Sequence, residues 1–170
     1  VLDYVELPGD PADGAVWASL TELLNTPIQH ELGGLLRVDA YAHDMGGHRT
    51  EAVKHYVRQR LVRRPMAIFG ATANNAPVLG KGKLADVDWR GKVDKRGVTI
   101  YAVGTVAAKH YLYGRLSTDA DKPSDQRTTH FSEQLEEQHP GYFAGLVSET
   151  FNPAKNRFEK RRGARNEPLD

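Results

Sequence analysis

The sequence predicts an α/β domain with a mostly parallel or mixed sheet, and three observations lead to this expectation. Apolar and polar residues alternate from 36 to 43, which is the two-residue period of a half-buried strand. Two short apolar runs, Met66–Phe69 and Val98–Val103, stand between turn signals and are typical of buried strands. Segments with apolar residues at helix spacing alternate with these strands, and such alternation favours an α/β sheet.

Length and composition narrow the classes of protein. A chain of 170 residues is expected to form one domain and to bury a core without covalent staples. The absence of Cys excludes disulfides, thiolate metal sites and a Cys nucleophile. No apolar run reaches the length of a membrane span, so no membrane partner is expected.

The charge is uneven although the net charge is only +1. Basic residues gather around the end of the first long helix, in the stretch from 81 to 96, and at the C-terminus. Local basic patches on a near-neutral protein favour a polyanion such as nucleic acid as partner. The alternative for each patch is an ordinary solvated surface.

The N-terminal elements are expected as follows. Val1–Leu7 is predicted to be the end of a strand. A turn rich in Pro and Gly follows, and Asp13 is placed to cap a helix that ends at 25–27. The apolar stripe of this helix is formed by Trp17, Leu20, Leu23 and Leu24. A loop is expected at 31–34, before the alternating strand.

The second half is less regular. The stretch 70–97 is predicted to be a long loop, with a short hairpin around Val87–Trp89 as the alternative. After the strand at 98–103, a helix is expected to begin at Gly104-Thr105. A polar loop is expected at 117–127, and a helix from Pro140 is expected to end at Asn152-Pro153. Phe158 is expected on a short strand.

The stretch 35–50 is the centre of the functional argument. Its strand delivers Asp44 at the carboxyl end, Gly46-Gly47 suits a tight turn, and a helix is expected from about Thr50. This arrangement holds a carboxylate at the edge of an open α/β sheet, where ligands tend to bind. The alternative is an Asp that only caps the turn or the helix.

Common catalytic motifs are absent from the sequence, which has no P-loop, no dinucleotide fingerprint, no GxSxG elbow and no HExxH helix. His43, Asp44 and His48 are a weaker alternative as a mixed metal site, because their spacing matches no standard signature. Acids beside basic patches suit a Mg²⁺-dependent phosphodiesterase, in which carboxylates hold two cations.

Four segments carry a resemblance to a known family: GDPADGAVWASL, HDMGGHRTEAVKHYV, VGTVAAKHYLYGRL and RRGARNEPLD. In this order they resemble the nuclease domain of the large terminase subunit of tailed phages, the lambda-like GpA family. The similarity covers nearly all of residues 1–170. It implies a single nuclease domain with an RNase H-like mixed sheet flanked by helices. It also implies a fragment of a longer chain, without the first strands and the last helix of the fold.

The resemblance implies an endonuclease that cuts concatemeric double-stranded DNA with two Mg²⁺ or Mn²⁺ ions. The same resemblance implies that Asp44 and Asp170 are the catalytic acids that hold the metals. Glu167 is a neighbouring ligand or a helix-start residue, and His48 contacts a phosphate or metal-bound water or else stabilises the turn. The expected DNA-binding residues are His48, Arg49, Lys81, Lys83, Lys92, Arg161, Arg162 and Arg165.

The implied partners are double-stranded DNA, the small terminase subunit and the portal protein, in the cytoplasm of the phage host. Three departures from the family pattern stand beside this, apart from Met45, which replaces the usual Ser. The first family acid is not found, since Asp3 falls at the wrong place. The family helix that bears the last acid is expected to continue beyond Asp170, where this sequence stops. Val106 stands where relatives often carry an acid. A non-catalytic module that binds DNA or the portal is therefore the rival hypothesis, and a related resolvase or transposase is a third.

Overall fold

The computed structural model describes residues 1–30 and 32–165. The chain divides into two compact units, which are described separately. The sheet unit comprises Leu7–Ala71 and Leu79–Val103. The helical unit comprises Val1–Glu6, Thr72–Val78 and the chain from Gly104 onward.

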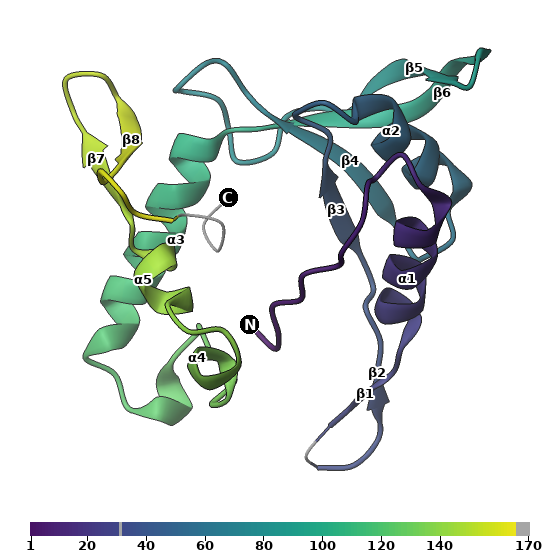
Figure 1. The fold of residues 1–170 in the computed structure, drawn as a ribbon. Helices are drawn as coiled ribbons and strands as arrows, with labels where there is room; N and C mark the ends of the chain where they lie inside the picture. Colours follow the sequence, from purple (N-terminus) through teal and green to yellow (C-terminus); the bar gives the residue numbers. More distant parts are fainter. Residues whose placement is uncertain (31, 166–170) are drawn as a thin grey trace. The chain divides into compact units, whose positions relative to one another are not determined.

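The sheet unit is built on a four-stranded mixed sheet (Figure 1). Its strands stand in the order β3 (Tyr41–Asp44), β4 (Pro65–Gly70), β6 (Lys92–Val103) and β5 (Lys83–Trp89). The first three run parallel, and β5 runs antiparallel to β6. The predicted α/β class with a mixed sheet is confirmed, whereas the RNase H-like topology stays a prediction.

Helices cover one face of this sheet. In α2 (Thr50–Gln59), Val53 and Val57 are buried against Ala67, Val87 and Val98 of the three longer strands. The helix α1 (Gly14–Asn25) begins as expected, because the Asp13 carboxylate accepts a hydrogen bond of 3.1 Å from the Ala15 N–H. Trp17 of α1 packs against this core as a partly buried residue.

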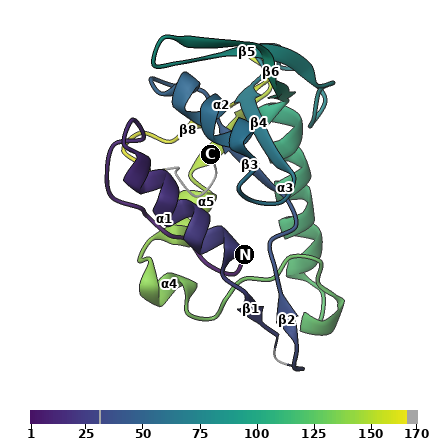
Figure 2. The same ribbon diagram turned by 90° about the vertical axis from the view of Figure 1, so that its right-hand side faces the viewer.

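The predicted long strand from residue 36 is wrong in its first half. Leu35–Leu36 forms β2, which pairs with β1 (Ile28–Gln29) in a separate two-stranded ribbon before β3 (Figure 2). The exposed fractions of Leu35 and Leu36 are 63% and 50%. Alternation specifies which face of a strand is apolar but does not specify its partner strand, so one pattern was divided between two sheets.

The predicted loop at 70–97 is also wrong from Lys83 onward. There β5 and β6 form a hairpin, far longer than the alternative around Val87–Trp89. Its two turn residues, Arg90 and Gly91, have positive φ angles of 51° and 77°, which suit a tight hairpin turn.

The helical unit contains α3 (Thr105–Ala120), a 3-10 turn (η1, Ser124–Gln126), α4 (Leu135–Gln138), α5 (Tyr142–Leu146) and a hairpin of β7 (Glu149–Asn152) and β8 (Arg157–Lys160). The start of α3 and the strand at Phe158 are confirmed. The polar loop at 117–127 begins later than expected, because α3 continues to Ala120. The helix expected to run to Asn152-Pro153 ends at Leu146, since that segment crosses to β7.

Val1–Leu7 is not a strand. The Val1 ammonium donates to the His130 carbonyl, and the Ser132 N–H donates to the Val1 carbonyl. Leu2 and Val5 are exposed, whereas Tyr4 packs against the core of the helical unit and not on a sheet.

Two polar clusters stabilise the helical unit. The Lys109 ammonium of α3 pairs with the Glu149 carboxylate of β7 at 2.9 Å, with side chains only 14% and 7% exposed. The carboxylate of buried Asp119 accepts hydrogen bonds from Lys122, Thr128 and Thr129. Burial raises the pKa of Asp119, but these donors together hold it well below its usual range. No helix in residues 1–30 or 32–165 is long and apolar enough to cross a membrane.

Candidate active site

Asp44 is the last residue of β3, and its side chain is exposed at the carboxyl end of that strand. Its Oδ1 atom accepts a hydrogen bond of 2.8 Å from the Gly46 N–H. A Cβ atom at Gly46 would lie only 3.1 Å from Oδ1, so glycine permits this close approach. Asp44 therefore does cap the turn, as the alternative expected. Its Oδ2 atom has no hydrogen-bond donor or cation as partner within the described part of the chain.

The turn that presents Asp44 is fixed from both sides. The Met45 N–H continues the sheet by donating to the Ile68 carbonyl at 2.8 Å. The Thr50 hydroxyl, at the first residue of α2, donates to the Met45 carbonyl at 2.7 Å. The Met45 side chain packs against the core under α2, so a long apolar residue at this position has a structural function.

His43 lies on the opposite face of β3 from Asp44, because neighbouring strand residues point to opposite faces. Its ring packs edge-on against Trp17, Tyr41 and Tyr56, at centroid distances of 5.7, 4.8 and 5.3 Å. The mixed metal site of His43, Asp44 and His48 finds no support in this geometry. No group of three metal-ligating side chains occurs in the described residues.

Burial lowers the pKa of His43 to about 4, and its Nε2 atom is buried without a hydrogen-bond partner. Below the ordinary value of 6.5 the unfolded chain takes up a proton that the folded chain does not. The contribution of His43 to the free energy of unfolding should therefore be constant above about pH 6.5 and should fall by about 1–2 kcal/mol toward pH 4, a figure reduced for partial burial.

We expect His43→Phe to remove this part of the pH dependence and to retain the ring contacts. Urea unfolding of both proteins at about pH 7.5 and pH 4.5 measures the effect. The stability of the variant relative to the native chain should rise as the pH falls. A difference that is the same at the two pH values would contradict the buried neutral histidine.

The other expected residues of this segment are placed differently. His48 is exposed in the turn after Gly47. Arg49 precedes the first turn of α2, and its guanidinium pairs with the Asp10 carboxylate at 2.5 Å. The Ala12 N–H and Arg49 hold the pKa of Asp10 below its usual range. The predicted acids Glu167 and Asp170 lie outside the described residues.

The three predicted DNA-binding lysines of the sheet unit do not form one patch. Lys83 pairs with Ile100, which precedes Tyr101 in β6. Tyr101 pairs with Ile68, and Ile68 pairs with Asp44, so these three residues form one row across the sheet. Lys81 lies two residues before Lys83, at the same end of the hairpin. Lys92 pairs with Trp89 at the other end, about 20 Å away along the strand.

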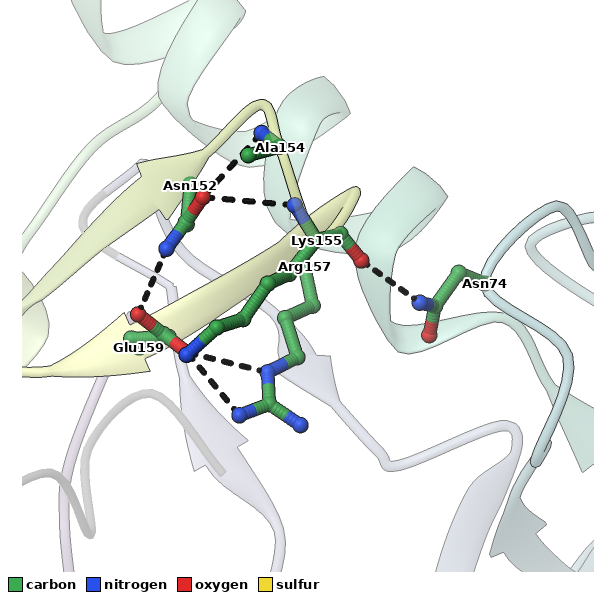
Figure 3. Close-up of polar contacts among 6 residues, drawn as sticks. All are labelled: Asn74, Asn152, Ala154, Lys155, Arg157 and Glu159. Carbon is green, nitrogen blue, oxygen red and sulfur yellow. Dashed lines mark hydrogen bonds and ion pairs between the residues drawn. The ribbon is translucent and has the colours of Figure 1, made fainter.

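The C-terminal basic residues follow the β7–β8 hairpin, whose turn is held by a polar network (Figure 3). The Asn152 side-chain oxygen accepts from the Ala154 and Lys155 N–H groups, and the Lys155 carbonyl accepts from the Asn74 amide. The Glu159 carboxylate accepts from Lys155, Asn152 and Arg157, which lower the pKa of Glu159 to about 2. Lys155 and Arg157 are therefore engaged by this carboxylate.

Among the predicted tail residues, Arg161 is partly tied down. Its N–H donates to the Ser148 carbonyl at 2.9 Å, and its Nε donates to the Thr150 hydroxyl at 3.4 Å. Arg162 and Arg165 are exposed, and Arg165 lines a small polar cavity beside Tyr4 and Tyr142. Within the predicted basic tail, Arg162 and Arg165 are therefore better placed than Arg161 to contact a ligand.

The sheet unit also has a groove of about 620 Å³ between α1, α2 and the tip of the β5–β6 hairpin. Its aromatic lining includes Trp17, Tyr56 and Trp89, with His55 stacked on Trp89 at 4.9 Å. Asp44 is not among its lining residues. This groove was not expected from the sequence, because its residues come from three separate segments.

Comparison with known proteins identifies the family. The family model for the endonuclease domain of terminase large subunit gpA matches residues 1–170. The large terminase subunit of Enterobacteria phage P21 is 25% identical over 130 residues, which is 76% of this chain and 19% of that protein. The chain therefore spans about a fifth of the length of this curated relative. No solved structure shows significant similarity. Because the family model covers the whole sequence, the chain belongs to the family of terminase large subunit gpA endonuclease domains.

Proposed function

We propose that this chain is a metal-dependent endonuclease domain that cuts concatemeric double-stranded DNA during phage genome packaging. The family match over residues 1–170 carries the proposal. The exposed Asp44 carboxylate at the end of a parallel strand supports it, since this is where open α/β sheets bind ligands.

Hydrolysis of a phosphodiester requires an activated water and a stabilised leaving oxygen, and two bound divalent ions supply both. Carboxylate oxygens are suitable ligands for Mg²⁺ or Mn²⁺. In the described part of the chain Asp44 offers one open carboxylate oxygen, which is too little for a two-ion site by itself. We propose Asp170 and Glu167 as further ligands on the basis of the family resemblance.

The proposed partners follow from this function. The DNA substrate would meet the residues expected from the sequence, with few contacts to base edges. These are His48, Arg49, Lys81, Lys83, Lys92, Arg161, Arg162 and Arg165. The choice of cutting site would come from a small terminase subunit, and the portal protein would receive the DNA. All of this would take place in the cytoplasm of the phage host.

Incubation of the chain with supercoiled plasmid and Mn²⁺, or Mg²⁺, tests the proposal. We expect nicked and linear products, and none after chelation by EDTA. Cleavage must also depend on Asp44, which excludes a contaminating nuclease. Cleavage that persists in EDTA, or none with either ion, would contradict a metal-dependent nuclease in this chain.

A non-catalytic module that binds DNA or the portal is the second candidate. The observation that favours it is the lack of a group of three ligating side chains in the described residues. Salt-sensitive DNA binding without cleavage under any metal condition would support this candidate against the first.

A further inference from the structure

Four arginines of the sheet unit have left-handed backbone conformations. Arg60, Arg64, Arg90 and Arg96 have φ angles of 53°, 45°, 51° and 54°. Glycine adopts this conformation without steric cost, and a long side chain does not. Each arginine therefore occupies a backbone conformation that glycine would adopt at lower cost, which directs attention to what these side chains do.

Two of the four meet in one groove. Arg60, which ends α2, and Arg96, in β6, both line a polar groove of about 240 Å³ together with Arg58 and Tyr101. The groove is smaller than the roughly 300–1,000 Å³ of sites for drug-sized ligands. Its size and composition suit a small anionic group.

The charge balance leaves this groove positive. Arg58 pairs with Asp94, and Lys95 pairs with Asp86 at 2.8 Å. The backbone N–H of Arg96 also donates to Asp86, but its side chain does not reach that acid. Among the described residues, neither the Arg60 nor the Arg96 side chain has a carboxylate within ion-pair distance. Two uncompensated guanidinium groups therefore line one small groove.

The register of the sheet relates this groove to Asp44. Pro65, the first residue of β4, lines the groove, and Ile68 of the same strand pairs with Asp44. Arg96 stands five residues before Tyr101 in β6, and five residues of strand span about 16 Å, which equals about five base pairs along the axis of B-DNA. Tyr101 lines the groove and also stands in the row of Asp44. One DNA segment can therefore reach both places.

We propose that the groove lined by Arg58, Arg60 and Arg96 binds backbone phosphates of duplex DNA about five base pairs from the bond cut near Asp44. Guanidinium groups bind phosphate oxygens in a bidentate manner and carry no base information in this role. The register with the cut bond rests on the proposed nuclease function, whereas phosphate binding by the groove does not.

The left-handed arginines provide a matched test. In the double variant Arg60→Gly/Arg96→Gly, two charges are lost from the groove while backbone strain is relieved, so the fold should be retained. The control, Arg64→Gly/Arg90→Gly, makes the same change at two left-handed positions that do not line the groove. Urea unfolding checks that both variants are folded.

Binding to a labelled duplex is measured in EDTA as a function of salt. The groove variant should lower the slope of log K against log salt by about 1.8 and weaken binding roughly 60-fold at about 0.1 M salt. The control should retain the native slope. Equal losses in the two variants, or a native slope in the groove variant, would overturn the proposal and leave an acidic protein segment as the candidate ligand.

Failure of the proposed function has a different signature. If groove-dependent binding is found without metal-dependent cleavage, the phosphate site stands and the nuclease proposal fails. If the groove variant cleaves plasmid with native KM and kcat, the nuclease stands and the phosphate site fails.

Discussion

Asp44→Asn is expected to lower the rate of metal-dependent DNA cleavage by at least about 100-fold, which corresponds to about 2.7 kcal/mol of transition-state stabilisation. An Asn oxygen can still accept the hydrogen bond from the Gly46 N–H, so the turn after β3 should be retained. What is lost is the negative charge on the oxygen that has no partner in the described structure. The prediction is measured as the initial rate of loss of supercoiled plasmid with Mn²⁺.

Asp39→Asn is the matched control. Asp39 precedes β3, and its exposed carboxylate pairs with Arg63 at 3.0 Å. Loss of an exposed ion pair changes stability by less than about 1 kcal/mol, and the native cleavage rate should be retained. If Asp44→Asn cleaves as fast as the native chain and remains folded, Asp44 is not a metal ligand in the reaction.

The position of Asp44 could be predicted because its signals are local. A strand period, two glycines and a helix pattern follow one another within 16 residues, and each depends only on nearby backbone geometry. The same local logic predicted the Asp13 cap and the start of α3. Local prediction failed at Leu35–Leu36, because the choice of partner strand is a tertiary property.

The β5–β6 hairpin shows a second limit. Ala85, Val87 and Trp89 do alternate with polar residues, but Arg90-Gly91 is not one of the usual hairpin turn sequences. The pairs between Asp86 and its partners Lys95 and Arg96 stabilise the strands from outside the apolar pattern. A strand that is stabilised by charged groups of its partner strand cannot be recognised from its own segment of sequence alone.

Basic patches were visible in the sequence, but their grouping was not. The lysines at 81, 83 and 92 formed one cluster in the sequence and are placed at two ends of a hairpin. Arg60 and Arg96 are 36 positions apart and line one groove. Charge density along a chain predicts the class of partner, whereas pairing of strands decides which charges act together.

The second large effect is expected at the start of α3. Gly104→Ala should lower the free energy of unfolding by about 3 kcal/mol or more. A Cβ atom at this position would clash with the Ala76 carbonyl oxygen and would lie 2.5 Å from that of Pro77, and both are backbone atoms that cannot rotate away. The Gly104 N–H donates to the Pro77 carbonyl at 3.0 Å, so separating the two segments also breaks a hydrogen bond.

Gly114→Ala is the opposite case in the same helix. No atom lies within 4 Å of a Cβ built there, and alanine in a helix interior is favoured over glycine by about 1 kcal/mol. Urea unfolding should therefore move the two Gly→Ala variants in opposite directions from the native chain. Equal stability of Gly104→Ala and the native protein would mean that residues 76–77 do not pack on the start of α3. The contrast separates a glycine required by close backbone approach from one that the helix merely tolerates, a difference that the two identical letters in the sequence do not reveal.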